Sequence, residues 1–396
     1  MTSGMPRVAL VMVAVADLSG SGGAERQFSD LFDHLHASSP RRVTFVTSRT
    51  SVIRLRAARR LRSADGIVAL PLGTRPAQSR AGILWMTLAL AWATLGRGFD
   101  VVHICLPTPS YVPYAALVTW LPEAWRPRVT LTVLDCTLAH HLRHGGASDL
   151  YEQQVVQAHQ MYFRWTRLDG IYTWYRAFVD AAQSLRLLSA RAVLTAAKYC
   201  FTDPTRFTPD PVKSRTVVYA GRLSAQKRPL LFVDAVASLL RRHADIARGW
   251  SFEMYGAGVL EPQVRARIAV LNLGQIIMLT SAPDLAPVFS RSQVFVSTQA
   301  FENFTSLAML EAMAAGNIVI AEAAGQTGEF VRDGENGILV SEATPDAFAD
   351  AIAVVIQRPE LHAAMGAESR RLATEVHTIE HFAGDILAFW RDVARV

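Results

Sequence analysis

The sequence predicts an α/β protein made of two doubly wound domains, each with a parallel β-sheet covered by helices on both faces. Short runs rich in Val and Ile alternate with longer helical stretches, and this alternation occurs twice along the 396 residues. Runs of this kind are typical of parallel strands that are buried on both faces. A proline-rich break separates the two series, and a chain of this length has room for two or three domains.

The first series occupies the N-terminal half of the chain. Its predicted strands are residues 8–15, 43–47, 66–71, 101–104 and 129–133, and its clearest predicted helices are residues 24–37 and 81–95. Residues 145–200 carry two tryptophans and several tyrosines without a clear period, and we expect helices there. The N-terminal domain is predicted to span residues 1–205.

The second series begins after the polar segment 202–214, whose three prolines indicate a linker. Its predicted strands are residues 216–219, 251–255, 276–279, 294–297, 318–321 and 338–340, and its predicted helices are residues 228–242, 262–271, 306–315 and 345–357. The C-terminal domain is predicted to span residues 212–379.

The composition excludes several classes of protein. Hydrophobic residues make up 51% of the chain and charged residues 19%, which is incompatible with a disordered or collagen-like protein. Three cysteines are too few for a disulfide framework, and this favours a reducing compartment such as the cytoplasm.

The longest apolar run, residues 81–95, is shorter than the roughly 17–25 residues of a membrane-spanning helix. Residues 8–16 weakly resemble a signal peptide, but their Val content fits a buried first strand better.

Charge is distributed unevenly between the two halves. Residues 1–210 hold 23 Lys and Arg against 14 Asp and Glu, and residues 211–396 hold 17 against 20. The excess in the first half is densest at five arginines: Arg54, Arg56, Arg59, Arg60 and Arg62. A basic half predicts an anionic partner, such as a membrane surface, a phospholipid-linked acceptor or nucleic acid. The alternative is a solvated Arg-rich helix without a partner, and no aromatic-interleaved basic repeat supports nucleic acid.

A glycine-rich segment, residues 20–26 (GSGGAER), follows the first predicted strand and opens a helix. Glycines at such a turn allow backbone N–H groups to approach a phosphate at the positive end of the helix. We therefore predict an anion-facing loop, with a plain turn as the alternative. A dinucleotide fingerprint would need glycine at Glu25 and an acid at the end of the second strand, where Thr47 and Ser48 stand.

A second motif, residues 221–227 (GRLSAQK), follows the first strand of the second series. Arg222 and Lys227 stand five positions apart across a turn, so both could converge on one diphosphate. Further along, residues 325–329 (GQTGE) and 333–337 (DGENG) precede the last predicted strand, and we interpret their glycines as structural.

The densest motif is residues 301–316 (FENFTSLAMLEAMAAG). A loop that carries Glu302 leads into a helix that Thr305 or Ser306 could cap. Glu311 then lies among apolar residues of that helix, where an acid is costly unless it has a partner. A pair of sugar hydroxyls is such a partner, and a protein group or a solvent-facing position is the alternative.

In this order, the motifs resemble the retaining nucleotide-sugar glycosyltransferases of family 4, which have the GT-B fold. The resemblance is strong over about residues 215–345, and in the first half it rests on residues 22–26, 100–103 and 134–135. It implies two Rossmann-like domains that face a central cleft, with the donor held mostly by the second domain. It also implies a last helix, residues 380–396, that crosses back to the first domain.

The resemblance gives roles to individual residues. Arg222 and Lys227 are expected to hold the donor diphosphate, Glu311 to accept bonds from the ribose hydroxyls, and Glu302 to meet hydroxyls of the transferred sugar. Four backbone amides are expected to face the phosphates and the sugar, those of Phe304, Thr305, Ser306 and Leu307. Gly22 and Gly23 belong to the loop expected to close over the donor. The two cations and a helix N-terminus supply positive charge where the diphosphate leaves, so no metal and no other cofactor is expected.

Two departures from the family pattern concern catalysis. Glu302 and Glu311 enclose eight residues, where the usual pair encloses seven. Leu134 stands where many members have a histidine near the reacting carbon, and Asp135 and His103 are the candidate substitutes. In a front-face retaining reaction the diphosphate itself takes the acceptor proton, so the missing histidine need not abolish activity.

A possible helix after residue 135 would place Cys136, His140 and His144 on one face, a spacing that also suits zinc. We prefer acceptor contact by His140 or His103, or plain packing, and predict no metal site.

These features predict a retaining glycosyltransferase that moves a sugar from a nucleotide diphosphate donor, UDP before GDP, to a hydroxyl acceptor in glycan, glycolipid or natural-product assembly. Family habit suggests a cytoplasmic protein, peripheral on the inner membrane face, and nucleic acid is not an expected partner. Two alternatives stay open. One is a non-catalytic member that binds sugar or a partner subunit, and the other is a nucleotide-sugar epimerase of the same fold.

Overall fold

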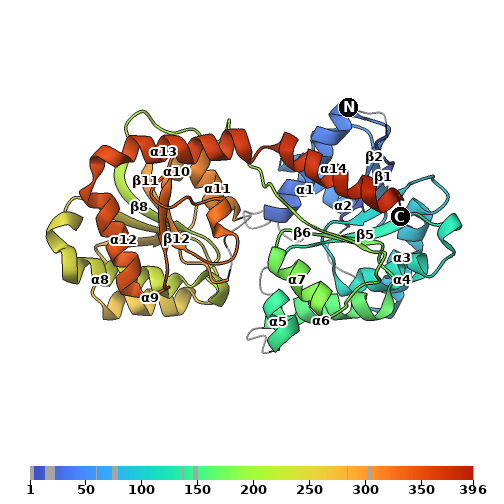
Figure 1. Cartoon of the computed structure of the whole chain (residues 1–396), viewed down its shortest axis with the longest axis horizontal. Coiled ribbons are helices and arrows are strands. Elements are labelled where there is room, and N and C mark those ends of the chain that lie inside the picture. Colours follow the sequence, from blue (N-terminus) through green and yellow to red (C-terminus); the bar gives the residue numbers. More distant parts are fainter. Residues whose placement is uncertain are drawn as a thin grey trace. The chain divides into compact units, whose positions relative to one another are not determined.

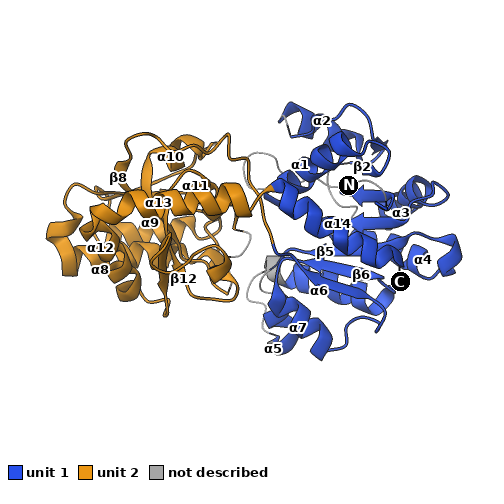
Figure 2. Ribbon diagram, turned by 45° about the horizontal axis from the view of Figure 1, so that its top comes forward, with its two compact units in different colours: residues 1–198, 379–396 blue, residues 199–378 orange. Residues whose placement is uncertain are grey.

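The chain divides into two compact units, Met1–Lys198 with Ile379–Val396, and Tyr199–Thr378 (Figure 2). The computed structural model describes residues 4–13, 23–58, 60–73, 79–135, 138–145, 150–282, 284–301, 303 and 306–395. Strands and helices alternate through both units (Figure 1).

The first unit is built on a parallel sheet with seven strands in the described part of the chain. In order across the sheet they are β3 (Ile67–Leu70), β2 (Val43–Ser48), β1 (Val8–Val11), β4 (Val101–Ile104), β5 (Arg128–Val133), β6 (Gly170–Thr173) and β7 (Val193–Ala196). The chain first adds strands on one side of β1, up to β3, and then on its other side, from β4 to β7, which makes the topology doubly wound. Every residue of β1, β4 and β6 is buried, as expected for strands covered on both faces.

Helices follow almost every strand of this unit. They are α1 (Gly23–Ser38), α2 (Arg49–Ala57), α3 (Arg80–Thr94), α4 (Val112–Thr119), α5 (Leu138–His144), α6 (Leu150–Trp165), α7 (Arg176–Ser184) and α14 (Ile379–Arg395). The helices α1 and α14 pack together, and α4 packs between α3 and α6. Short 3₁₀ turns at Pro109–Tyr111 and Glu123–Trp125 flank α4.

The last helix, α14, packs on β4, β6 and β7 although it is the C-terminal end of the chain (Figure 1). Its Trp390 is fully buried, and the Asp385 carboxylate accepts a hydrogen bond of 2.7 Å from the Tyr172 hydroxyl. Gly170 allows this close approach. A Cβ atom there would lie 2.8 Å from the carbonyl oxygen of Val193 and 2.9 Å from a methyl carbon of Val393.

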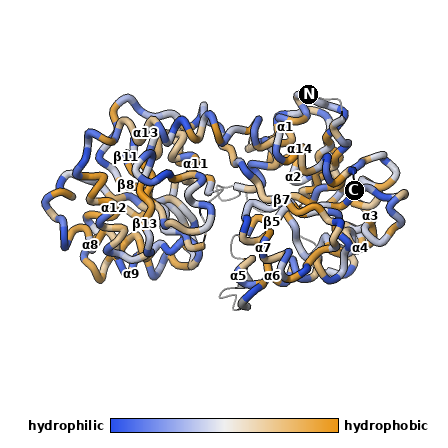
Figure 3. The backbone as a smooth tube through the Cα atoms, viewed as in Figure 1, coloured by the Kyte–Doolittle hydropathy of each residue, from blue (hydrophilic) through white to orange (hydrophobic). Residues whose placement is uncertain are grey.

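The second unit repeats the plan with a parallel sheet of six strands among its described residues. In order across the sheet they are β10 (Ile277–Thr280), β9 (Ser251–Tyr255), β8 (Ser214–Ala220), β11 (Ser292–Ser297), β12 (Ile318–Glu322) and β13 (Gly337–Val340). Its helices are α8 (Pro229–Ala247), α9 (Glu261–Val270), α10 (Ala286–Arg291), α11 (Leu307–Ala314), α12 (Pro345–Gln357) and α13 (His362–Arg371). Hydrophobic residues are frequent along the strands of each unit (Figure 3), and many of them are buried.

One core cluster of this unit lies beneath α8, α9 and α12. The helices α10, α11 and α13 form a second group of mutual contacts. The helix α8 is kinked at His243, which has non-helical backbone angles.

Two of the differences from the prediction concern residues 145–205. Residues 145–200 were expected to be helical, but they contain β6 and β7 between helices. These strands, GIYT and VLTA, each hold a single Val or Ile, and one begins with glycine, so they lack the Val-rich and Ile-rich composition of the predicted strands.

The second difference concerns the boundary between the units. Residues 199–205 belong to the second unit and not to the first domain. Cys200 and Phe201 are buried there, and the Cys200 amide lies 3.4 Å from His377 Nδ1. The proline-rich segment is therefore packed on the second unit.

Candidate functional site

The predicted cation pair and the predicted acidic helix both follow strands at the centre of the second sheet. β8 and β11 are parallel neighbours, and they mark the switch point at which the chain stops adding strands on one side of β8 and begins to add them on the other. Ligands of doubly wound sheets bind beyond the carboxyl ends of the strands at such a switch point. The turn at residues 221–228 leaves β8 at this edge, and residues 298–301 leave β11 at the same edge.

The turn after β8 is held against the loop after β9. The Gly221 amide donates to the Tyr255 carbonyl oxygen (3.0 Å), and the Leu223 amide donates to that of Ala257 (2.9 Å). Glycine is needed at Gly256, because a Cβ atom there would lie 1.9 Å from the Gly221 carbonyl oxygen. These contacts fix the backbone that carries the two cations.

Lys227 lies at the end of a 3₁₀ turn, Ala225–Lys227, and is tied to the loop after β11. Its carbonyl oxygen accepts hydrogen bonds from the Thr298 hydroxyl (2.9 Å) and the Tyr219 hydroxyl (3.3 Å). Its half-buried ammonium group donates to Gln299 Oε1. Arg222 stands on the same turn with an exposed side chain. The structure therefore places both cations on one anchored turn at the switch point.

Arg228 is a residue of this region that sequence reasoning missed. It has a left-handed backbone, with φ 43°, directly before the proline that starts α8. A non-glycine residue in that backbone conformation costs about 1–3 kcal/mol of folding free energy, and it persists only where surrounding contacts hold it.

The Arg228 guanidinium makes contacts of this kind. It donates to the carbonyl oxygens of Thr298 (2.7 Å) and Gln299 (3.1 Å) and forms an ion pair with Glu322 at the end of β12. One side chain thus connects the ends of three strands. A consecutive Lys-Arg-Pro was the signal in the sequence, but the partners of Arg228 come from distant segments.

Asn303 anchors the loop after β11 and was also missed. It is fully buried, and its Oδ1 accepts a hydrogen bond of 2.5 Å from the Ser297 hydroxyl. Its backbone N and its Nδ2 lie 3.3 Å and 3.4 Å from the hydroxyl oxygen of Thr327. The predicted site residues next to it lie outside the described residues: Glu302, Phe304 and Thr305.

The helix α11 begins at this loop. Ser306 occupies the N-cap position, but its side chain makes no capping hydrogen bond, and Thr305, the other predicted cap, lies outside the described residues. Its amide donates to the Asn303 carbonyl oxygen (2.9 Å), so a phosphate at this amide would compete with that bond. Leu307 is the first helical residue.

Glu311 is 6% exposed and lies between the fully buried Leu310 and Ala312. The expected acid within an apolar helix is therefore present on α11.

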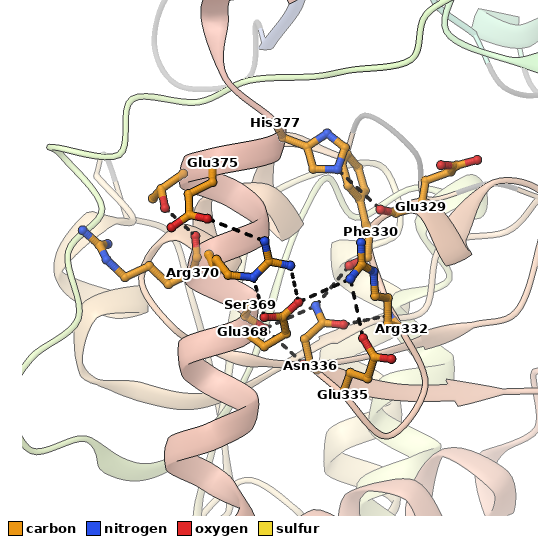
Figure 4. A network of polar contacts seen from close by, with 12 residues as sticks. Glu329, Phe330, Arg332, Glu335, Asn336, Glu368, Ser369, Arg370, Glu375 and His377 are labelled. Carbon is orange, nitrogen blue, oxygen red and sulfur yellow. Dashed lines mark hydrogen bonds and ion pairs between the residues drawn. The ribbon is translucent and has the colours of Figure 1, made fainter. Parts of the chain in front are cut away.

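The turn between residues 330 and 337 supports the second unit (Figure 4). Asn336 is fully buried, its Oδ1 accepts from the Arg332 amide (2.7 Å), and its Nδ2 donates to the Phe330 carbonyl oxygen (3.0 Å). Its carbonyl oxygen accepts from the Ser369 hydroxyl of α13 (3.1 Å). A Cβ atom at Gly337 would lie 2.1 Å from a carbonyl oxygen of β12. These contacts agree with a structural role for this motif.

The predicted residues of the first unit are only partly described. Gly23 is the first residue of α1, while Gly22 and the rest of the glycine-rich loop before it lie outside the described residues. Asp135 is half-buried, two residues beyond the end of β5. His140 is exposed on α5, with its ring centroid 5.6 Å from that of His141. Cys136, the first member of the zinc alternative, lies outside the described residues.

His103 is a core residue, contrary to its predicted contact with the acceptor. It is fully buried on β4, and its Nδ1 and Nε2 lie 2.8 Å and 2.7 Å from the hydroxyl oxygens of Thr130 and Thr132. Its ring packs at 5.5 Å against that of Trp390 on α14. Burial lowers the pKa of His103 to about 3, so the imidazole is neutral at neutral pH. With both ring nitrogens occupied, it is not a candidate base or acceptor ligand.

Comparison with known proteins agrees with this geometry. The family described as "Glycosyl transferases group 1" matches residues 214–358, which include the turn after β8 and α11. A lipopolysaccharide core biosynthesis mannosyltransferase, LpcC of Rhizobium leguminosarum bv. viciae, is 25% identical over 352 residues, or 84% of this chain and 94% of the relative. Residues 214–358 therefore match the group 1 family, and most of the chain is similar to a glycosyltransferase.

Further relatives of this glycosyltransferase match one part of it. A D-inositol 3-phosphate glycosyltransferase of Mycolicibacterium paratuberculosis is 33% identical over 192 residues, which cover 47% of this chain and 42% of the relative.

Solved structures confirm the fold class, with two Rossmann-like units as in GT-B glycosyltransferases. Sucrose-phosphate synthase of Thermosynechococcus elongatus superposes with a TM-score of 0.73 at 18% identity and 98% coverage of both chains. Anabaena HepE, solved with UDP and glucose, has a TM-score of 0.69 at 16% identity, with 97% of this chain and 99% of that chain covered.

Among the described residues, no three His, Cys, Asp or Glu side chains gather as a metal ion would require. Within the same ranges, no helix combines the length and apolar character needed to cross a membrane.

Proposed function

We propose that this glycosyltransferase retains the anomeric configuration while it transfers a sugar from a nucleotide diphosphate donor, with UDP preferred to GDP, to a hydroxyl acceptor. The observation that carries the proposal is the anchored turn after β8, which presents Arg222 and Lys227 at the switch point of the second sheet. The solved structures of Anabaena HepE with UDP and with UDP-glucose support UDP as the nucleotide.

The proposed roles follow from charge and from position on the sheet. Arg222 and Lys227 compensate the negative charge that develops on the leaving diphosphate, so the proposal needs no metal ion. Glu311, on the helix after the neighbouring strand, accepts hydrogen bonds from the ribose hydroxyls. Glu302 contacts hydroxyls of the transferred sugar.

The proposed proton transfer does not depend on a side chain of the first unit. The bond between the anomeric carbon and the diphosphate oxygen breaks, and its electron pair leaves with the diphosphate. The acceptor oxygen bonds to the anomeric carbon on the same face, and its proton passes to the departing diphosphate oxygen. Leu134 in place of a histidine is compatible with this route, and Asp135 remains the candidate for assistance because His103 is buried.

The acceptor is proposed to be a hydroxyl of a glycan, a glycolipid or a natural product. The relatives named for lipopolysaccharide core biosynthesis and for D-inositol 3-phosphate support an acceptor with sugar-like hydroxyls. We place this reaction at the cytoplasmic face of the inner membrane, on the basis of the basic first half of the chain.

A thermal-shift panel of UDP-, GDP- and ADP-sugars tests the donor, because ligand that binds the native state raises Tm with occupancy. We expect UDP-sugars to raise Tm most. An equal response to all three, or none, would contradict a specific nucleotide site.

The stereochemistry and the alternatives need a second measurement. The protein should hydrolyse its donor slowly, and NMR can follow the sugar that is released. The first sugar to appear should have the anomeric configuration of the donor, and an inverted sugar would contradict retention. Bound but intact donor after long incubation would instead indicate a non-catalytic sugar-binding protein. A changed sugar still attached to its nucleotide would indicate an epimerase.

A further inference from the structure

Five of the eight tryptophans are more than half exposed, and all five belong to the first unit. They are Trp85 (54%), Trp92 (66%), Trp120 (59%), Trp125 (77%) and Trp165 (54%). Tryptophan is normally among the more buried residue types, so this concentration calls for a partner.

The helix α3 is apolar on its outer face as well as on its inner face. Leu84, Trp85, Leu88 and Trp92 are exposed; Leu84, Leu88 and Trp92 follow one another every four positions and Trp85 is adjacent to Leu84, which places all four on one side of the helix. The opposite side, which includes Leu90, is buried. A surface helix normally carries polar residues outward, and α3 does not.

The neighbouring helix α4 continues this surface. α3 and α4 pack together (Figure 1). The Thr94 and Tyr114 hydroxyls lie 2.8 Å apart on the buried side. Leu117 and Trp120, the residue that ends α4, are exposed, and Trp120 donates from Nε1 to the Trp165 carbonyl oxygen at the end of α6 (3.0 Å). We call six exposed side chains of α3, α4 and the C-cap of α4 the tryptophan face: Leu84, Trp85, Leu88, Trp92, Leu117 and Trp120.

Two arginines lie directly against the tryptophan face. The Arg97 guanidinium lies 4.5 Å from the ring centroid of Trp92, and that of Arg167 lies 3.7 Å from the ring of Trp120. Residues 66–99 contain no Asp or Glu, and neither do residues 101–122. Apolar side chains and indole rings beside arginines suit the boundary between lipid tails and anionic headgroups.

We propose that the tryptophan face docks on the surface of a membrane that contains anionic lipid. The helix α3 has 15 residues, about 22 Å at 1.5 Å per residue, which is shorter than the roughly 30 Å of a hydrocarbon core, so it lies on the membrane and does not span it. The tryptophan face does not include the arginines at 54–62. Membrane docking through it requires neither the donor nor catalysis.

Flotation with phospholipid vesicles tests the proposal on the full chain. We expect the protein to bind vesicles of phosphatidylcholine with phosphatidylglycerol, and more weakly those of phosphatidylcholine alone. Replacing Trp85→Ser and Trp92→Ser together should reduce binding to the mixed vesicles by about tenfold or more. The matched control is Val259→Ser with Val270→Ser, two exposed apolar side chains of the second unit, which should bind like the wild type.

A second pair of substitutions isolates the charge. Arg97→Gln with Arg167→Gln should remove the preference for phosphatidylglycerol and leave the weak binding to phosphatidylcholine. Equal Tm values for all variants establish that they fold.

Three results would overturn the proposal: no wild-type binding to either vesicle, equal binding by the tryptophan variant, or an unchanged lipid preference in the arginine variant. A wild-type dimer that becomes a monomer in the tryptophan variant, without vesicle binding, would assign this face to a second copy of the chain.

Discussion

Replacing Lys227 by alanine is expected to remove transition-state stabilisation without unfolding the second unit. The turn keeps its backbone contacts in this variant, because the hydroxyls of Thr298 and Tyr219 bind the carbonyl oxygen of Lys227 and not its side chain. What is lost is the half-buried ammonium group that lies next to Gln299.

The size of the loss follows from the charge. At about 4 Å from a diphosphate oxygen and with an effective dielectric constant of about 20, one unit charge contributes about 4 kcal/mol. Losing a single charge-stabilising group costs about 2–4 kcal/mol in known enzymes. The expected decrease in kcat/KM is therefore roughly 30- to 900-fold.

The assay is the initial rate of nucleotide diphosphate release from the sugar donor found in the thermal-shift panel. Arg248→Ala is the control, because it also removes a cation from the second unit. The Arg248 side chain is 85% exposed and lies outside the proposed site. Lys227→Arg should recover part of the activity, since it keeps the charge. If Lys227→Ala turns over donor within threefold of the wild-type rate, the site is assigned to the wrong turn.

The remaining predictions concern the ribose partner, the buried histidine and the last helix. Glu311→Ala should lower kcat/KM by an amount equivalent to about 2–4 kcal/mol, and wild-type kinetics in this variant would contradict its proposed contact with the donor. The low native pKa of His103 means that the unfolded chain takes up a proton below about pH 6.5 while the native chain does not. Stability should therefore fall as the pH drops from about 6.5 towards 3, by about 2 kcal/mol between pH 7 and 5 from this residue. Urea unfolding at the two pH values should show that His103→Gln loses this difference while the exposed His140→Gln keeps it, and an unchanged slope in His103→Gln would refute the assignment. Gly170→Ala should destabilise the first unit by about 1–3 kcal/mol, because its Cβ atom would meet backbone and α14 side chains. Gly384→Ala on α14, where nothing lies within 4 Å of a Cβ atom, should raise stability by about 0.5–1 kcal/mol, and a Tm that falls equally in both variants would argue against the tight approach at residue 170.

Local patterns identified most of the strands. Valine-rich runs such as residues 43–47 and 101–104 are long enough to be recognised, and both are strands of the first sheet. β6 (GIYT) and β7 (VLTA) were missed because each holds a single Val or Ile, and because Gly170 weakens the first of them.

The chemistry of the site was predicted only in part. Arg222, Lys227 and Glu311 attract attention as residue types at suggestive spacings, and the structure places them after neighbouring strands. Arg228 and Asn303 were missed because each acts through partners from distant segments. Arg228 binds carbonyl oxygens 70 and 71 residues away, and Asn303 lies against Thr327, 24 residues away.

The sequence by itself determined the fold class and the motifs that carry the two cations, because these depend on residue type and on spacing along the chain. Only the tertiary structure decided what His103 does and where the apolar surface of α3 lies. A histidine on a valine-rich strand has the same sequence signature in a site as in a core. Its role depends on two threonines of β5 and a tryptophan of α14, which folding brings to it from up to 287 residues away.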